Sequence, residues 1–451
     1  MKLKYIFIAV LMVSVARQSV GQHELTLFHM NNVFQGTYVN PTLMPEHKVS
    51  LGLPGMSSVY FMLNNSTWRA NDFKKKINDD SVIFNLEGAV NKLDNKNYVN
   101  TAFSTDLFSL RIKIRNTFAS INVTEQVDFR LNYPKDLFKL INQGNAQFVG
   151  EAADFSGLRV NSSHYREYAL GLARIRDGAK FSYGVRLKLL QGLNNVKTVK
   201  SDARISIDEQ YYAHTLKASA QVNSSTIAND TTGNEDYVKA LTSFDNMGWG
   251  LDLGATYHVN HRLSFTGSLV NLGAITWKSN VVNRSIDGEY TFSGIKLDLQ
   301  NDSIKVDIDA VLDSLKSAFK IKETYNQSYK TSLPPRMYLS MGYMLGRNTK
   351  VALTFYNEFY QGMNPAISAA YVQRAGRILN FLFTYTAKKN SFNNVGAGLM
   401  LKLIAMQIYM VGDNMLAIAN PFNATNFNLR FGINLVFGRI RKPDEQSHNE
   451  E

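Results

Sequence analysis

The sequence predicts an all-β fold: a transmembrane antiparallel β-barrel of about 14 strands, with short helices in its loops. Three observations support this. The last segment alternates strictly between apolar and polar residues, and the same alternation recurs along the chain in runs as long as a membrane-spanning strand. Beyond the N-terminus, no apolar stretch is long enough for a spanning helix. Together these features favour a membrane barrel over a soluble sheet protein.

The closing segment, NFNLRFGINLVFG at 426–438, has the clearest pattern. Successive side chains of a strand point to opposite faces of the sheet. One face of this strand therefore carries only apolar side chains, namely Phe427, Leu429, Phe431, Ile433, Leu435 and Phe437. The other face is polar or has no side chain. A soluble sandwich would bury the apolar face against a second sheet, whereas a membrane barrel would turn it toward lipid.

Similar alternation occurs at 108–114, 117–123, 181–189, 249–259, 263–269, 337–343, 351–359, 379–385 and 395–403. Alternation alone fits any half-buried sheet. Length discriminates better, because membrane-spanning strands need about 9–11 residues whereas soluble strands average about 5–6. Several of these runs have the longer length. We expect about 14 strands, since such barrels prefer even numbers.

The N-terminus predicts export. A basic start at 1–4, an apolar stretch at 5–15 and small residues at 19–21 are typical of a signal peptide covering residues 1–21. The absence of cysteine excludes a lipoprotein anchor, a disulfide framework and thiolate chemistry. No later stretch approaches the roughly 18 apolar residues of a spanning helix. A mature chain within a membrane would therefore have to be a closed barrel, because lipid cannot satisfy an open sheet edge.

Composition and charge agree with this reading. The chain is 45% hydrophobic, yet its mean hydropathy is only −0.20, as expected when lumen-facing polar residues dilute apolar ones. The net charge of +12 is dispersed, apart from Lys74, Lys75 and Lys76. We therefore expect no nucleic-acid binding. We expect these charges to contact anionic lipid headgroups of the membrane or acidic solutes.

The candidate site residues are charged side chains at predicted lumen-facing positions: Arg186, Lys188, Asp252, Glu358, Lys402 and Arg430. Paired acids and bases could perform general acid–base chemistry. More often such groups solvate an interior and brace one wall against another. The sequence contains no HExxH, GxSxG, phosphate-loop or dinucleotide-binding motif. We expect no enzyme activity, no catalytic residue, no metal site and no cofactor.

The facing of the strands gives predictions for single residues. Leu251, Phe431 and Leu435 should face lipid, whereas Asp252 and Arg430 should face the lumen. A charge at the bilayer midplane costs about 2–4 kcal/mol. Phe431→Arg should therefore impair insertion, and Arg430→Gln should be tolerated.

A few stretches depart from alternation. Long loops are expected near 195–245, with strand extensions as an alternative there, and near 300–333, with an amphipathic helix within 303–324. A second short helix is expected at 134–144, with Pro134 near its start and Gly144 as its C-terminal cap. Glycines within the strands weaken them unless something needs the space. They allow either the approach of an internal segment or ligand, or the curvature of the barrel.

Several motifs resemble those of a known family. They are Asn40-Pro41-Thr42, close to the Asn-Pro-Ala element of FadL-type transporters, together with LGLPG at 51–55, REYALG at 166–171, LKLLQG at 187–192, LPPR at 333–336, VGDNM at 411–415 and NLRFGINLVFG at 428–438. The combination resembles a barrel family that is distantly similar to FadL and occurs in bacteria with type IX secretion. The resemblance implies an N-terminal hatch at 22–47 carrying Asn40 and Pro41, a barrel at 48–438, and a polar tail at 439–451.

The resemblance also implies a location in the outer membrane and two functions. One is passive transport of small hydrophobic compounds through the plugged barrel; in FadL such molecules leave through the wall beside a strand kink. The alternative is a structural barrel that supports secretion-system proteins, as PorV-type barrels do. A soluble extracytoplasmic β-protein that binds a ligand or does chemistry is the third possibility from the residues alone. The expected partners are therefore outer-membrane lipid and either a small hydrophobic ligand or secretion-system proteins.

Overall fold

The computed structural model describes residues 24–43, 46–78, 81–175, 178–226, 241–292, 317–319, 321–376, 378–388 and 391–440. The expected signal peptide at 1–21 lies outside the described residues. So do residues 441–451 of the expected tail and most of the helix expected within 303–324.

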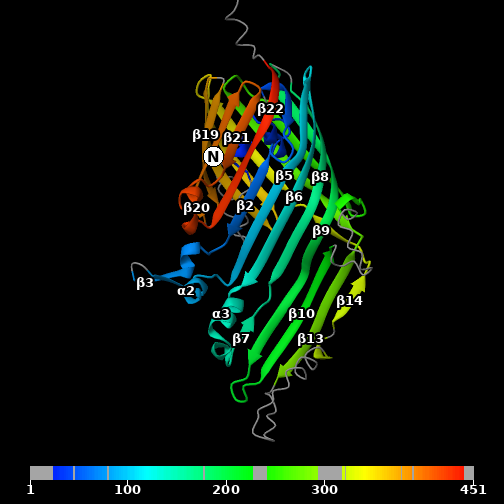
Figure 1. Ribbon diagram of the computed structural model, residues 1–451, viewed down its shortest axis with the longest axis vertical. Coiled ribbons are helices and arrows are strands. Elements are labelled where there is room, and N and C mark those ends of the chain that lie inside the picture. Colours follow the sequence, from blue (N-terminus) through cyan, green and yellow to red (C-terminus); the bar gives the residue numbers. More distant parts are fainter. Residues whose placement is uncertain are drawn as a thin grey trace, which may run out of the picture.

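The described strands form a closed antiparallel barrel with 14 wall positions, which confirms the predicted fold class (Figure 1). Two short strands share the first position, because both pair with β22 on one side and with β5 on the other. The wall strands are β1 (His47–Gly52) with β2 (Val59–Asn65), β5 (Lys96–Ile114), β6 (Thr117–Pro134), β8 (Arg159–Arg174), β9 (Phe181–Ile207), β11 (Met247–His258), β12 (Leu263–Trp277), β16 (Arg336–Met344), β17 (Thr349–Phe359), β18 (Met363–Ala375), β19 (Leu379–Lys388), β20 (Ser391–Leu403), β21 (Met406–Gly412) and β22 (Asn426–Arg439).

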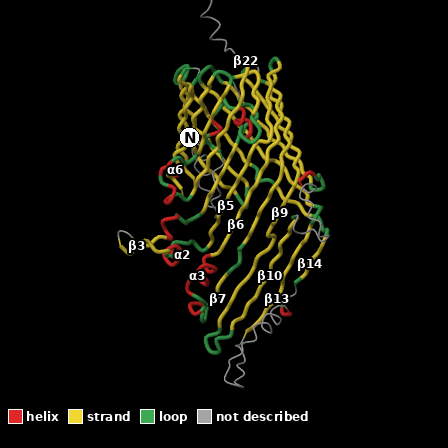
Figure 2. The backbone as a smooth tube through the Cα atoms, viewed as in Figure 1, coloured by secondary structure: helices red, strands yellow, loops and turns green. Residues whose placement is uncertain are grey.

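The two ends of the barrel differ (Figure 2). At one end, called here the short-turn end, neighbouring strands join through turns such as 115–116, 259–262 and 404–405. The opposite, long-loop end carries the helices α2 (Leu86–Asn91), α3 (Lys135–Gln143) and α6 (Leu416–Ala419), the 3-10 helices η3 (Ala70–Phe73), η4 (Ala146–Phe148) and η6 (Pro421–Asn423), and the hairpin of β3 (Lys74–Asn78) and β4 (Ser81–Phe84). Helix α3 matches the helix expected at 134–144, with Pro134 as N-cap and Gly144 at φ +74° as C-cap.

A sheet projects from the long-loop end, in a region where long loops with strand extensions were expected. In the described part of 195–245 the strand extensions dominate, because β9 continues to Ile207 and β10 (His214–Ser225) pairs with it. β10 also pairs along its whole length with β13 (Val281–Phe292), and two shorter strands flank the sheet, β7 (Ala152–Asp154) beside β9 and β14 (Lys322–Tyr325) beside β13. A further short strand, β15 (Tyr329–Ser332), pairs with the end of β12. These strands are rich in Ser, Thr and Lys, and backbone pairing needs no apolar face. Hydrophobic alternation therefore gave little sign of them.

Large apolar side chains cover the outside of the wall. Leu170, Leu172, Leu187, Leu353 and Phe383, from four different strands, are each more than half exposed. Along β22, Phe431 is 46% exposed whereas its neighbour Arg430 is 4% exposed. Alternate residues therefore face an interior that is largely polar. Among the described residues, none of the helices has the length and apolar character needed to cross a membrane.

Candidate functional site

The N-terminal residues 24–43, called here the inner segment, lie inside the barrel. They include the 3-10 helices η1 (Leu27–His29) and η2 (Phe34–Tyr38). The apolar side chains of this segment form a buried core with wall residues that include Tyr338 on β16, Tyr356 on β17 and Tyr409 on β21. Phe28 stacks on Tyr338 with ring centroids 5.1 Å apart. The inner segment is thus packed against the wall as a protein core would be.

Polar contacts hold the inner segment at several points. The backbone N–H of Thr26 donates to Asp413 at 2.7 Å, and the Thr26 hydroxyl lies 2.8 Å from that of Thr384. Further along, the Gln35 and Asn434 side-chain amides exchange hydrogen bonds of 3.1 and 2.9 Å. These partners are on β19 and β22 and just beyond the end of β21, so the segment is attached to several strands.

Burial also sets the charge state of the inner segment. The His29 ring is 2% exposed and lies 3.0 Å from the Thr354 hydroxyl. Burial lowers the pKa of His29 to about 3, with a further lowering from the positive charge of Lys350. The ring is therefore neutral at physiological pH.

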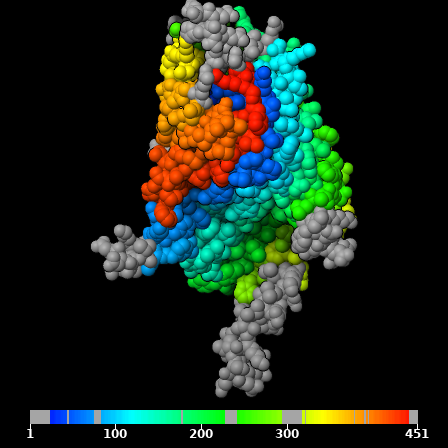
Figure 3. Space-filling view, turned by 45° about the horizontal axis from the view of Figure 1, so that its top comes forward, coloured from blue at the N-terminus to red at the C-terminus, as the bar shows by residue number. Residues whose placement is uncertain are grey.

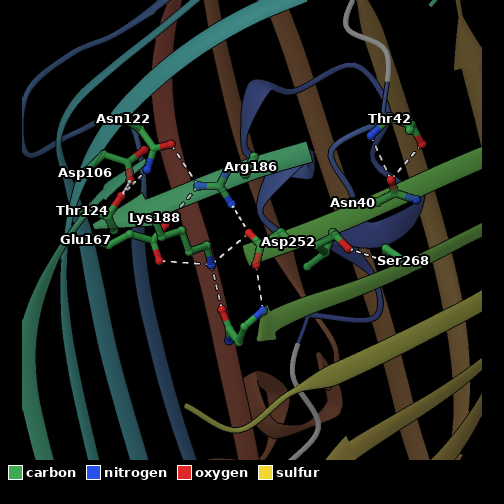
Figure 4. A network of polar contacts seen from close by, with 12 residues as sticks. Asn40, Thr42, Asp106, Asn122, Thr124, Glu167, Arg186, Lys188, Asp252 and Ser268 are labelled. Atoms are coloured by element: carbon green, nitrogen blue, oxygen red, sulfur yellow. Dashed lines mark hydrogen bonds and ion pairs between the residues drawn. The ribbon is translucent and has the colours of Figure 1, made fainter. Parts of the chain in front are cut away.

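The expected hatch residues Asn40 and Pro41 lie against strands β9, β11 and β12 (Figure 4). The Asn40 Oδ1 accepts hydrogen bonds from the backbone and hydroxyl of Thr42, at 2.9 and 2.8 Å, which folds the chain into a turn. A Cβ on Gly254 would lie 2.3 Å from Asn40 Oδ1, and one on Gly184 would lie 2.9 Å from Pro41 Cβ. At these two positions glycine allows the inner segment to touch the wall, one of the two roles considered for strand glycines.

Three of the sequence-derived charged residues meet in one buried cluster (Figure 4). Arg186 Nη1 donates to Asp252 Oδ2 at 2.8 Å, and its Nη2 donates to Glu167 Oε1 at 3.0 Å. Lys188 Nζ lies 2.9 Å from the same Asp252 oxygen and 3.2 Å from Glu167 Oε2. Two cations and two anions thus bridge the adjacent strands β8, β9 and β11. We call these four residues the wall cluster.

The other three sequence-derived residues are elsewhere. Arg430 is buried and pairs with Glu24 of the inner segment, Nε to Oε1 at 2.5 Å. Glu358 on β17 accepts a hydrogen bond of 2.9 Å from Arg130 on β6, a strand far around the barrel, so this pair connects two sides of the interior. Lys402 is half-buried and pairs in register with Gln407. The six residues therefore do not form a single site.

Sequence reasoning missed the carboxylate that connects the inner segment to the wall. Asp106 Oδ2 accepts hydrogen bonds from the Tyr38 hydroxyl at 2.6 Å and the Ser57 hydroxyl at 3.3 Å, while Oδ1 accepts one from Thr124 at 3.0 Å. Its position follows Asn100, Ala102 and Ser104 in alternation along β5. That parity was a signal of inward facing, but its partners are distant in the sequence.

Residues 53–58, called here the wall excursion, interrupt the first wall strand. Gly52 at the end of β1 pairs with Ser109 and Asn434, and Val59 at the start of β2 pairs with Thr105 and Phe431. The excursion therefore stands opposite only 106–108 in β5 and 432–433 in β22. It is longer than either neighbouring stretch, so the chain must leave the plane of the wall there.

The wall excursion has one side on the outer surface and the other on the inner segment. Met56 is 55% exposed, whereas Ser57 is fully buried. The Ser57 carbonyl accepts hydrogen bonds from the Gln35 amide at 3.0 Å and from the Tyr409 hydroxyl at 2.9 Å. Figure 3 shows where the first wall strands (blue) meet β22 (red) on the surface. A displacement of the inner segment would therefore break its hydrogen bond to the wall excursion.

A family model described as a family of unknown function, DUF5723, matches residues 41–413. No curated protein matches the sequence. Solved structures of similar architecture include a FadL homologue of Pseudomonas aeruginosa (7% identity, TM-score 0.42, 88% of this chain and 92% of that chain). Others are the toluene transporters TbuX of Ralstonia pickettii (9%, 0.41, 88% and 92%) and TodX of P. putida (8%, 0.41, 90% and 95%). Likeness at this level says nothing about what the chain binds.

Proposed function

This chain belongs to the DUF5723 family, whose function is unknown, and from its interior we propose that it is an outer-membrane barrel through which small hydrophobic compounds pass. The observation that carries the proposal is the contact between the inner segment and the wall excursion. A segment that lies inside the lumen, and that touches the interrupted strand of the wall, is suited to act as a plug.

The outer surface supports the membrane location. Lipid requires a closed barrel with apolar side chains outside, and the exposed side chains of the strands include Leu170, Leu187, Leu353 and Phe383. Outer-membrane barrels have short periplasmic turns and longer extracellular loops. In the proposed orientation the short-turn end therefore faces the periplasm, and the long-loop end faces the exterior.

The lining of the proposed path supports a hydrophobic cargo. The inner segment contacts the wall through Leu25, Leu27, Phe28 and other apolar side chains. A compound that separates the segment from the wall would meet these groups. The nearby charges offer little to a charged cargo, because those of the wall cluster already neutralise one another. From there the wall excursion would give an exit toward lipid at Met56.

Disulfide staples test the plug directly, because the chain has no cysteine of its own. The hydroxyls of Thr26 and Thr384 are 2.8 Å apart, and those of Thr42 and Thr256 are 2.9 Å apart. Sulfurs in their places can bond with little backbone movement. We expect either double cysteine variant, when oxidised, to stop uptake of radiolabelled naphthalene by cells that carry the barrel. Reduction should restore the uptake.

A staple within the wall is the matched control. The hydroxyls of Ser368 and Thr386, on β18 and β19, are 2.9 Å apart. The variant Ser368→Cys with Thr386→Cys should transport equally well oxidised and reduced. Uptake that is unchanged when the staples of the inner segment are oxidised would contradict the proposal that this segment is a plug. The remaining candidate function would then be that of a secretion-supporting barrel, which the contacts among the described residues do not specifically favour.

The membrane location has its own test. Phe431→Arg places a charge on the outer face of β22 and should cost about 2–4 kcal/mol of insertion free energy. Folding into lipid vesicles, followed by the different gel migration of unboiled and boiled barrel, measures this effect. Phe84→Arg is the control, because Phe84 is 72% exposed on the β3–β4 hairpin, outside the wall. Equal folding of both variants would contradict lipid contact at Phe431.

A further inference from the structure

A cavity of about 160 Å³ opens at the long-loop end of the interior. Its lining comes from the starts and ends of β5, β6 and β8, from the loop before β8, and from Gln361 in the turn between β17 and β18. Gln361 comes from another side of the barrel. Two residues just before it also contact strands near the cavity: Glu358 accepts a hydrogen bond from Arg130, and Tyr360 accepts one from Asn161 at 3.0 Å. Those contacts join β17 and its following turn to β6 and β8 next to the cavity.

Strand register explains why the lining gathers at one place. Tyr98 pairs with Asn132, and Asn132 pairs with Arg159, so these three residues form a row across β5, β6 and β8. The row below it contains Asn100, Arg130 and Asn161. Paired residues share a face of the sheet. Since Arg130 faces the interior, the upper row does too, as does Lys96, which is two residues before Tyr98.

The charge of the lining is positive. Lys96 and Arg159 are its charged side chains, and no carboxylate is part of it. The nearby Asp154 lies outside the lining; it accepts a hydrogen bond from the Ser156 backbone at 2.9 Å, lies 3.7 Å from Arg204 and interacts electrostatically with Lys96. Among the described residues, the lining itself therefore contains two cations and no carboxylate.

A buried polar atom in the lining lacks a partner among the described residues: Nε of Arg159. Tyr133 does not add a second, because it follows Asn132 along β6 and faces the other side of the strand, where its ring contacts Trp68 and Phe138 and its hydroxyl interacts with Ser66. Buried donors are almost always satisfied. The guanidinium N–H of Arg159 is therefore a donor at the cavity that awaits an acceptor.

We propose that this cavity binds the oxyanion group of a small molecule at the outer mouth of the barrel. The guanidinium of Arg159 matches the two oxygens of a carboxylate or phosphate, and Lys96 adds a point charge. Amides of Asn132 and Gln361 can orient the group. The volume is below that of drug-sized sites, so it admits an anionic group with a small body.

Isothermal titration of the refolded full-length barrel in detergent, at fixed ionic strength, tests the site with benzoate and inorganic phosphate as separate probes. We expect saturable binding of at least one of them. Arg159→Gln and Lys96→Gln should each weaken it at least tenfold. Tighter benzoate binding would identify an organic acid as the source of the oxyanion, and tighter phosphate binding a phosphorylated molecule; either order supports the site.

The control is Lys217→Gln, which removes a cation from the projecting sheet, where Lys217 is 74% exposed beside Glu289. The affinity of this variant for the two probes should equal that of the unsubstituted protein. Lys96 is exposed and outside the packed core, so its variant remains informative even if Arg159→Gln fails to fold. No saturable binding, or unchanged affinity in both lining variants, would overturn the proposal. Because purified protein is titrated, this result is independent of transport.

Discussion

The wall cluster and the contacts of the inner segment occupy the same interior but are built differently. In the wall cluster, each of the four charged groups has opposite charges within 3.2 Å. The inner segment reaches the wall mostly through its own uncharged groups, such as those of Thr26 and Gln35, although Thr26 and Tyr38 also donate to carboxylates of the wall. Among the described residues its ion pair with the wall is that of Glu24 and Arg430.

This difference indicates that the wall cluster is a fixed part of the barrel, whereas the inner segment can move. Removing one member of a buried ion cluster leaves a charge without compensation, which costs about 3–5 kcal/mol. A single hydrogen bond contributes less, about 0.5–1.5 kcal/mol between neutral groups and about 1.5–3 kcal/mol to a charged group, because water competes for each partner. The wall cluster is therefore suited to hold β8, β9 and β11 together permanently. The contacts of the inner segment are suited to break and form again.

The largest expected effect comes from the wall cluster. Arg186→Leu removes a partner from both Asp252 and Glu167, which are buried, and should lower the free energy of unfolding by about 3–5 kcal/mol. Urea unfolding of the refolded barrel in lipid vesicles measures it. Lys217→Leu breaks an exposed pair and should change stability by less than about 1 kcal/mol. Similar small losses in both variants would remove the distinction between fixed and mobile contacts.

Arg430→Gln should have the next largest effect, and it should act on the inner segment. The sequence alone suggested that this substitution would be tolerated; the pair with Glu24 changes that expectation. Loss of a charged hydrogen bond favours release of the segment by about 1.5–3 kcal/mol. A spin label at Asn31→Cys should become more mobile, while the barrel stays folded. Arg284→Gln, in an exposed pair with Glu323, should leave the label unchanged.

Gly254→Ala should displace the inner segment by overlap. The added Cβ would lie 2.3 Å from Asn40 Oδ1, and such overpacking costs about 1–3 kcal/mol. The same spin label should report increased mobility. Gly267→Ala is the control, because its Cβ would meet the flexible Leu339 side chain at 3.2 Å. Equal label spectra for the two alanine variants would show that Asn40 does not rest on the wall.

The smallest expected effect is a dependence on pH. Because the pKa of His29 is about 3 in place and near 6.5 when the segment is free, protonation favours the free segment. The stabilisation is complete above pH 6.5 and decreases as the pH falls toward 3. At pH 5.5 the released population should be about tenfold larger than at high pH. His29→Gln should make the released population nearly independent of pH. An equal pH dependence in that variant would contradict the role of His29.

Alternation of apolar and polar residues was sufficient to predict the class of fold. It works because lipid and lumen impose opposite demands on successive side chains, as Phe431 and Arg430 illustrate. The same rule places Arg186, Lys188 and Asp252 on one side of the sheet. Their meeting depends on strand register, for example Arg186 opposite Asp252, and this information is absent from local periodicity.

The contacts of the inner segment and the extent of the projecting sheet could not be predicted from local sequence patterns. Glu24 and Tyr38 meet the wall because the inner segment turns back into the lumen, and their partners Arg430 and Asp106 are far away in the sequence. The sequence indicated mainly loop, with strand extensions only as an alternative, where the projecting sheet lies, because its strands have no contact with lipid. Without lipid on one face, selection for apolar alternation disappears although backbone pairing remains.

The length of β9 gives experimental access to the living cell. Its 27 residues extend for about 90 Å at about 3.3 Å per residue, about three times the hydrocarbon thickness of roughly 30 Å. The turn at 208–213 therefore stands well outside the proposed membrane region. A peptide epitope inserted in that turn should be stained by antibody on intact cells, so that a single fluorescence measurement would report both delivery to the surface and orientation.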